Sequence, residues 1–77
     1  MLENRSPSVT SPTVALSPRE SDVLIQASLG LSYAEIAARL SLKPITVKGY
    51  MRTVLQKLQV HSRTEAVTVA RRLGLLP

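Results

Sequence analysis

The sequence predicts an all-α fold, a four-helix bundle, and two observations lead to it. The tetrapeptide Ser-x-x-Glu occurs three times, each time entering an apolar stretch with helical spacing. No window of strand length alternates cleanly between apolar and polar residues. In a capping box of this kind the serine oxygen accepts the N3 amide, and the glutamate carboxylate accepts the serine amide. Three helix starts are therefore expected, at Ser17-Pro18-Arg19-Glu20, Ser32-Tyr33-Ala34-Glu35 and Ser62-Arg63-Thr64-Glu65.

For the first two helices the sequence predicts the ends as well as the starts. The first is expected over about residues 18 to 28, because Pro18 suits the first helical position and Gly30 suits a left-handed residue after the last turn. The second is expected over about residues 33 to 40. It must end before Pro44, since the residue before a proline disfavours helical geometry.

The third helix is expected to open at Pro44 and to run to about Leu58. Lys43 takes its cap position and brings no oxygen that accepts an amide, so this start lacks a capping side chain. The fourth helix is expected over about residues 63 to 73, and Gly74 follows it as the left-handed residue.

Domain organisation is read from composition. Residues 1–15 are rich in Ser, Thr and Pro, with isolated apolar residues at no regular period, so they bury too little apolar area to offset their ordering entropy. We expect a flexible arm, or a linker that follows a separate sensing domain. Residues 16–77 form the folded domain.

The charge of the chain indicates an anionic partner. The 77 residues carry ten Lys and Arg against five Asp and Glu, a net charge of +5. Residues 31–77 alone carry eight basic and two acidic side chains, a net charge of +6. The basic surface therefore belongs to the folded part, where it favours a partner such as nucleic acid.

Several classes of protein are excluded. A chain of 77 residues without Cys and with His61 as its single histidine is too short for a multidomain enzyme and lacks the ligands of a zinc site. It has no paired carboxylates and no Gly-rich loop after a strand, so we expect no enzyme activity, no metal and no cofactor. His61 is interpreted as a turn residue. Without a membrane-length apolar run or a signal peptide, the protein is expected to be cytoplasmic.

The second and third helices are separated by only Ser41-Leu42-Lys43, which is typical of a helix-turn-helix unit whose second helix enters the DNA major groove. At 100° per residue, one side of the third helix carries a stripe expected to be buried, flanked by Tyr50 and Leu55: Val47, Met51, Val54 and Leu58. The opposite side carries no acid: Ile45, Lys48, Gly49, Arg52 and Gln56.

Two features of that opposite side favour an anion. Lys48 and Arg52 are like charges at i and i+4, an arrangement that destabilises a helix unless an anion lies between them. Gly49 costs about 1 kcal/mol relative to alanine inside a helix. Two interpretations of Gly49 stay open, namely close approach of the backbone to a groove floor and a tolerated defect.

A series of short motifs runs through the folded part of the chain: Leu16-Ser17-Pro18-Arg19-Glu20, Val23-Leu24, Gly30-Leu31-Ser32, Glu35-Ile36-Ala37, Leu40, Thr46-Val47-Lys48, Lys57-Leu58, Val60 and Ser62-Arg63-Thr64-Glu65-Ala66-Val67. In this order and spacing they resemble the LuxR/FixJ-type DNA-binding domain of bacterial transcription regulators over about residues 16 to 76. This resemblance implies a four-helix domain in which the third helix recognises DNA, the fourth helps dimerisation, and two related half-sites are bound.

The resemblance also implies site residues. Those that face bases are Lys48, Gly49 and Arg52. Those that contact phosphate are Ser32, Tyr33, Lys43, Thr46, Thr53, Lys57 and Arg63. The sequence departs from the family pattern where Lys43-Pro44 replaces the usual capping serine and its follower, where Tyr50 replaces a frequent histidine, and where Gly49 offers no side chain.

The fourth helix is expected to bury one side, formed by Ala66, Val67, Ala70 and Leu73. Val69 points about 160° from Val67 and is expected to be exposed on a monomer. The predicted dimerisation residues are Val69, Leu73 and Leu76, with Leu75 beside them. We expect a homodimer on DNA and a monomer when free.

Two functions from different classes fit these observations. The first is sequence-specific binding of double-stranded DNA by a transcription regulator, as the output domain of a response regulator or a similar protein with an upstream sensor or receiver domain. The alternative is a protein-interaction module that heterodimerises with related regulators through the fourth helix and inhibits them. Retention of Lys48 and Arg52 favours the first.

Overall fold

The computed structural model describes residues 14–77, and this part of the chain contains four α-helices and no strand. They are α1 (Pro18–Ser28), α2 (Tyr33–Leu40), α3 (Pro44–Leu58) and α4 (Arg63–Arg72). The all-α prediction is confirmed. Of the predicted arm over residues 1–15, the first 13 residues lie outside the described part. Val14 and Leu16 are partly buried and pack against the core.

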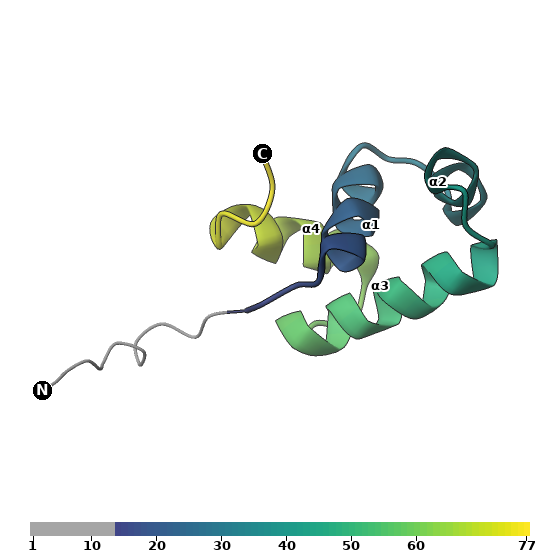
Figure 1. The fold of residues 1–77 in the computed structure, drawn as a ribbon. Coiled ribbons are helices and arrows are strands. Elements are labelled where there is room, and N and C mark those ends of the chain that lie inside the picture. The colour runs from purple at the N-terminus through teal and green to yellow at the C-terminus, as the bar shows by residue number, and fades with distance from the viewer. Residues whose placement is uncertain (1–13) are drawn as a thin grey trace, which may run out of the picture.

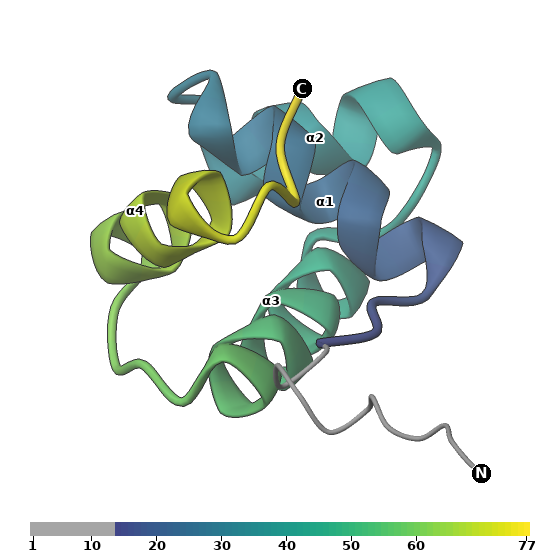
Figure 2. The same cartoon turned by 90° about the vertical axis from the view of Figure 1, so that its left-hand side faces the viewer.

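The longest helix, α3, packs against each of the other three (Figure 1). The α1 helix crosses above it, and α2 leads into it through a tight turn at one end. Turning the molecule by 90° shows α4 on the side of α1 away from α2 (Figure 2). None of the helices in residues 14–77 is long and apolar enough to cross a membrane.

The first two helix starts are complete capping boxes, as predicted. The Ser17 amide donates to Glu20 Oε1 at 2.8 Å, and the Glu20 amide donates to Ser17 Oγ at 3.2 Å. At the start of α2 the Ser32 amide donates to Glu35 Oε1 at 2.8 Å, and the Glu35 amide donates to Ser32 Oγ at 3.1 Å. Each box satisfies two donors that the helix itself leaves without a partner.

The third predicted box, at the start of α4, forms only by half. The Glu65 amide donates to Ser62 Oγ at 3.1 Å, but the Glu65 carboxylate accepts the His61 amide at 3.0 Å instead of the Ser62 amide. Ser62 has φ −142°, whereas the serines of the two complete boxes have φ −69° and −72°. This rotation turns the Ser62 amide away and leaves the preceding amide within reach.

The helix ends confirm both predicted left-handed glycines, Gly30 at φ +84° and Gly74 at φ +74°. Two further ends use left-handed residues that no sequence pattern predicted, Ser41 at φ 58° after α2 and Gln59 at φ 57° after α3. A non-glycine residue in this region carries a steric cost. The last helix ends at Arg72, one residue before the predicted end, with Leu73 as its cap.

The core lies between α3 and the other helices. The predicted stripe of Val47, Met51, Val54 and Leu58 is buried. It meets a set of buried aliphatic side chains from the other elements: Val23, Leu24, Ala27, Ile36, Ala37, Val60, Ala66 and Ala70. Because this one side of α3 closes the core, the opposite side remains in solvent.

The prediction for α4 was wrong at three positions. Its buried centre is Ala66 and Ala70, while Val67 is only partly buried and Leu73 is 46% exposed. Val69, predicted to be exposed, is partly buried and packs against the core. The helix packs against both α1 and α3, so the two valines flank the alanine line about equally, each roughly 80° from it. Leu73 lies beyond the last turn that α1 and α3 cover.

Candidate nucleic-acid interface

The side of α3 that faces solvent carries the predicted set: Ile45, Lys48, Gly49, Arg52 and Gln56. All five are exposed, and we refer to them as the outer face of α3. The buried stripe holds the opposite side in the core, so the fold itself presents the outer face. The helical spacing had predicted this division correctly.

The positive charge of the outer face is not neutralised within the described chain. In residues 14–77 the salt bridges join Arg19 to Asp22 at 3.7 Å and Lys57 to Glu20 at 2.7 Å, and neither involves Lys48 or Arg52. Lys43, the N-cap residue five positions before Lys48, is also exposed. Like charges in successive turns repel each other, so an anion placed on this face is stabilised by both.

The start of α3 adds backbone donors to this charge. Lys43 makes no capping hydrogen bond through its side chain, as predicted. The amides of Thr46 and Val47 both donate to the Lys43 carbonyl, at 2.9 Å and 3.1 Å. Pro44 has no amide hydrogen, so the Ile45 amide is the donor that remains at this end. The positive end of the helix dipole and exposed amide groups favour an anion such as phosphate.

Gly49 lies in the middle of the outer face with regular helical geometry. Apart from its two chain neighbours and the nearby backbone of α3, a Cβ atom added there would meet no atom of the described chain within 4 Å. Packing within residues 14–77 therefore gives no reason for a glycine at this position. The two interpretations that remain are close approach of another molecule and a tolerated defect.

The two predicted phosphate contacts at the start of α2 differ in their surroundings. Ser32 is exposed, and its hydroxyl oxygen accepts the Glu35 amide. The cap has an electrostatic effect, since its backbone hydrogen bond holds the pKa of Glu35 below the ordinary value. Tyr33 is partly buried, and its ring centroid lies 5.4 Å below the guanidinium carbon of Arg63.

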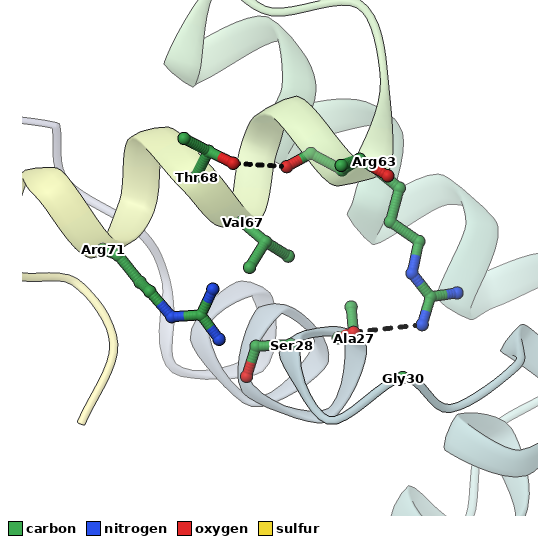
Figure 3. A pocket seen from close by; sticks show the side chains of 8 residues that line it. Ala27, Ser28, Gly30, Arg63, Val67, Thr68 and Arg71 are labelled. Atoms are coloured by element: carbon green, nitrogen blue, oxygen red, sulfur yellow. Dashed lines mark hydrogen bonds between the residues drawn. The ribbon is translucent and has the colours of Figure 1, made fainter.

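Arg63, a predicted phosphate contact, makes its hydrogen bonds within the protein. Its guanidinium donates to the Ala27 carbonyl at 3.1 Å and also to the Leu31 carbonyl. These contacts join the first residue of α4 to the turn between α1 and α2, and Figure 3 shows the side chain reaching Ala27. The arginine thus adds a second donor to the Ala27 carbonyl, which also accepts the Gly30 amide, and holds the Leu31 carbonyl in the connection.

Lys57 is likewise engaged within the fold. Its ammonium donates to Glu20 Oε1 at 2.7 Å and to the Ala15 carbonyl at 2.9 Å. Glu20 is only 8% exposed, and the hydrogen bond from Lys57 is the main cause that holds the pKa of Glu20 below its ordinary value. The pair joins the first turn of α1 to the last turn of α3 and fastens the segment before α1.

The two predicted threonine contacts, Thr46 and Thr53, are seven residues apart, lie on the same flank of the outer face and are partly buried. Thr53 donates to the Gly49 carbonyl at 3.2 Å, which leaves its oxygen lone pairs free. The structure thus brings Lys43, Thr46, Lys48, Gly49 and Arg52 together along one helix. Ser32 and Tyr33 lie one element earlier, whereas the charges of Lys57 and Arg63 face the protein.

Two other surfaces carry polar or apolar side chains. A shallow pocket of about 380 Å³ opens between the end of α1 and α4 (Figure 3), lined by Ala27, Ser28, Gly30, Arg63, Thr64, Val67, Thr68 and Arg71. At the predicted dimerisation residues, Leu73 is 46% exposed, while Val69 and Leu76 are partly buried. Within residues 14–77, no group of three His, Cys, Asp or Glu side chains lies close enough together to hold a metal ion.

Comparison with known proteins assigns this arrangement to a family. A family model described as bacterial regulatory proteins, luxR family, matches residues 14–70. The chain is 48% identical to the HTH-type transcriptional activator RamA of Corynebacterium glutamicum over 65 residues, 84% of this chain and 23% of RamA. It is 41% identical to the transcriptional regulatory protein DesR of Bacillus subtilis over 77% of this chain and 30% of DesR. The chain spans about a quarter of the length of such relatives.

Two solved structures share the fold. The transcription factor GerE superposes with a TM-score of 0.76 at 29% identity, covering 80% of this chain and 92% of GerE. The response regulator ChrA of a heme-sensing two-component system superposes with a TM-score of 0.78 at 40% identity, covering 88% of this chain and 34% of ChrA.

Proposed function

The chain belongs to the luxR family of bacterial regulatory proteins, and we propose that it binds double-stranded DNA sequence-specifically as the output domain of a transcription regulator, with α3 in the major groove. The observation that carries this proposal is the outer face of α3. It is exposed, basic and free of acid, and no acidic side chain of the described residues pairs with Lys48 or Arg52. The same face argues against the alternative, an inhibitory module that acts only through α4.

Base recognition is assigned to Lys48, Gly49 and Arg52. Lys48 and Arg52 donate to guanine N7 and O6, the acceptors that Lys and Arg contact most often in the major groove. Gly49 lies between them and lets the helix backbone approach the floor of the groove, because no Cβ projects from it. The lack of a side chain at Gly49 leaves direct readout mainly to the two basic residues.

Phosphate contacts are assigned to the starts of both helices of the helix-turn-helix unit and to one flank of α3. Ser32 and Tyr33 serve at the start of α2, Lys43 and Thr46 at the start of α3, and Thr53 beside the outer face. Phosphate contacts of this kind position a protein on the duplex without reading its sequence. Lys57 and Arg63 are the remaining predicted phosphate contacts. They are expected to contribute less to phosphate binding, because their charged groups already contact Glu20 and backbone carbonyls.

The full regulator is proposed to act in the cytoplasm as a homodimer on two related half-sites. This domain then works with an upstream sensor or receiver domain, a proposal supported by the match to only 34% of the response regulator ChrA. Val69, Leu73 and Leu76 are the proposed dimer contacts, and Leu73 offers the most exposed surface among them.

The test is a titration with DNA selected from a random pool, at 50 and 200 mM salt. Each phosphate that the protein neutralises is expected to reduce the affinity by about threefold to fourfold between these concentrations. Replacing both Lys48 and Arg52 by alanine is expected to weaken binding by at least about 30-fold, since each contact is worth about 1 to 3 kcal/mol.

The matched control replaces Arg71 and Arg72 of α4 by alanine. This variant also loses two positive charges, but from a helix that packs on the other side of the core. It is expected to weaken binding much less. Binding that does not depend on salt, or an equal loss in the two double variants, would contradict the proposal.

A further inference from the structure

Ile45 is the most exposed large hydrophobic residue among those that the structure describes. It is 72% exposed, compared with 63% for Leu29 and 46% for Leu73. It is the second residue of α3, and it belongs to the outer face, with Gly49 one turn away and Arg52 two turns away. Its apolar side chain therefore lies at the N-terminal end of the basic outer face, beside Lys48 and Gly49.

Packing among residues 14–77 does not account for an isoleucine at this position. Its side chain leaves the core entirely, so packing does not select it. A β-branched residue is a mediocre helix former, and the first turn of a helix favours acidic or capping side chains. Single exposed apolar residues are common on protein surfaces. The argument therefore depends on where Ile45 lies, not on its exposure alone.

We propose that Ile45 contacts the C5-methyl group of a thymine in the major groove and thereby adds a preference for a T·A pair. This inference rests on the proposed function. The first residues of a recognition helix are those that reach base edges. Of the groups that the four base pairs present in the major groove, the thymine methyl is the one that an apolar side chain contacts favourably.

The position of that thymine follows from helix geometry. Ile45 and Arg52 are seven residues apart, which at 1.5 Å per residue is about 10 Å along α3. Base pairs rise by about 3.4 Å along the duplex. The thymine that Ile45 contacts is therefore expected within about three base pairs of the base that Arg52 contacts, because an inclined helix spans less of the duplex axis than its own length.

The experiment replaces each thymine of the selected site by uracil, one at a time. This change removes only the methyl group and leaves the hydrogen-bonding edge as it was. At one thymine per half-site, uracil is expected to weaken binding of the unaltered protein about fourfold, the effect of one buried methyl group. With Ile45→Ala the same replacement is expected to leave the affinity unchanged.

Leu29→Ala is the matched control, because it removes an exposed leucine from the end of α1 and should retain the full uracil effect. An equal uracil effect with and without Ile45, or no uracil effect at any thymine, would overturn this inference while DNA binding itself stood. If no DNA is selected, or if binding ignores Lys48 and Arg52, the proposed function fails first. Circular dichroism of Ile45→Ala verifies that the fold is retained, as expected for a residue outside the core.

Discussion

Gly49 illustrates how one residue can weaken a fold while serving its surface. A glycine within a helix costs about 1 kcal/mol relative to alanine, because it loses more backbone freedom on folding. Close packing against a neighbouring element often explains a glycine inside a helix. At Gly49 no neighbouring element of the described chain would crowd a Cβ atom. Two interpretations remain at this position, namely the approach of an external surface, which we propose to be DNA, and a tolerated defect.

Replacing Gly49 by alanine should therefore separate stability from binding. The free energy of unfolding, measured by urea denaturation, is expected to rise by about 1 kcal/mol. The affinity for the selected DNA is expected to fall, because the added methyl group holds the helix away from the groove floor. If stability rises and the affinity stays the same, the glycine is a tolerated defect.

Exposed basic residues look alike in a sequence but differ in the folded chain. Lys48 and Arg52 face solvent, whereas Lys57 and Arg63 have found acceptors in the protein. The difference arises from partners far away in sequence. Glu20 lies 37 residues before Lys57, and Leu31 lies 32 residues before Arg63. No local pattern indicates which cations the fold will use.

At the scale of helices, the pair formed by Glu20 and Lys57 links the start of α1 to the end of α3. The carboxylate is nearly buried and accepts hydrogen bonds from both Lys57 and the Ser17 amide, so its pKa in the folded state lies below the ordinary value of 4.5. A depressed pKa means that the folded state prefers the ionised form. The resulting stabilisation is fully present above pH 4.5 and is lost as the pH falls through the folded-state pKa.

The expected consequence is an acid-sensitive fold whose sensitivity depends partly on Glu20. Between pH 7 and pH 3 the free energy of unfolding should decrease in the unaltered protein, and it should decrease less in Glu20→Gln. Glu35, whose pKa is also lowered, leaves part of the acid dependence in the variant. Urea denaturation at several pH values measures both curves, and identical slopes for the two proteins would refute a role for the pair.

The helix boundaries were the features of the fold that the sequence predicted best. Two complete capping boxes and two left-handed glycines are local devices that act within a few residues, so their residue patterns predicted the observed bounds. The half-formed box at Ser62 and the left-handed Ser41 and Gln59 escaped prediction. Their backbone angles are set by how the connections must run between packed helices, and several residue types tolerate the same turn.

For the whole molecule, the open question of assembly centres on Leu73. It was predicted both to be buried and to take part in a dimer, and the structure leaves 46% of it exposed at the end of α4. Val69 and Leu76 pack partly against the core. The exposed apolar surface that these three residues offer to a second copy is therefore smaller than the sequence predicted.

Replacing Leu73 by serine should preserve the fold and affect only assembly. Binding to DNA with a single half-site is expected to be unchanged, while the cooperative gain on DNA with two half-sites is expected to be lost. Sedimentation of the protein–DNA complexes counts the bound copies directly. Leu29→Ser is the control, since it exposes a serine at the end of α1, and an equal loss of cooperativity in both variants would argue against a dimer contact at α4.

The sequence by itself determined the all-α fold, the helix bounds and the two sides of α3, because capping and helical periodicity act between residues within about one to four positions of one another. Tertiary structure alone decided which basic side chains remain unpaired in the described chain, that both valines of α4 are only partly buried, and that no neighbouring element packs against Gly49. These outcomes depend on contacts between α1, α3 and α4, whose residues are brought together only when the chain has folded.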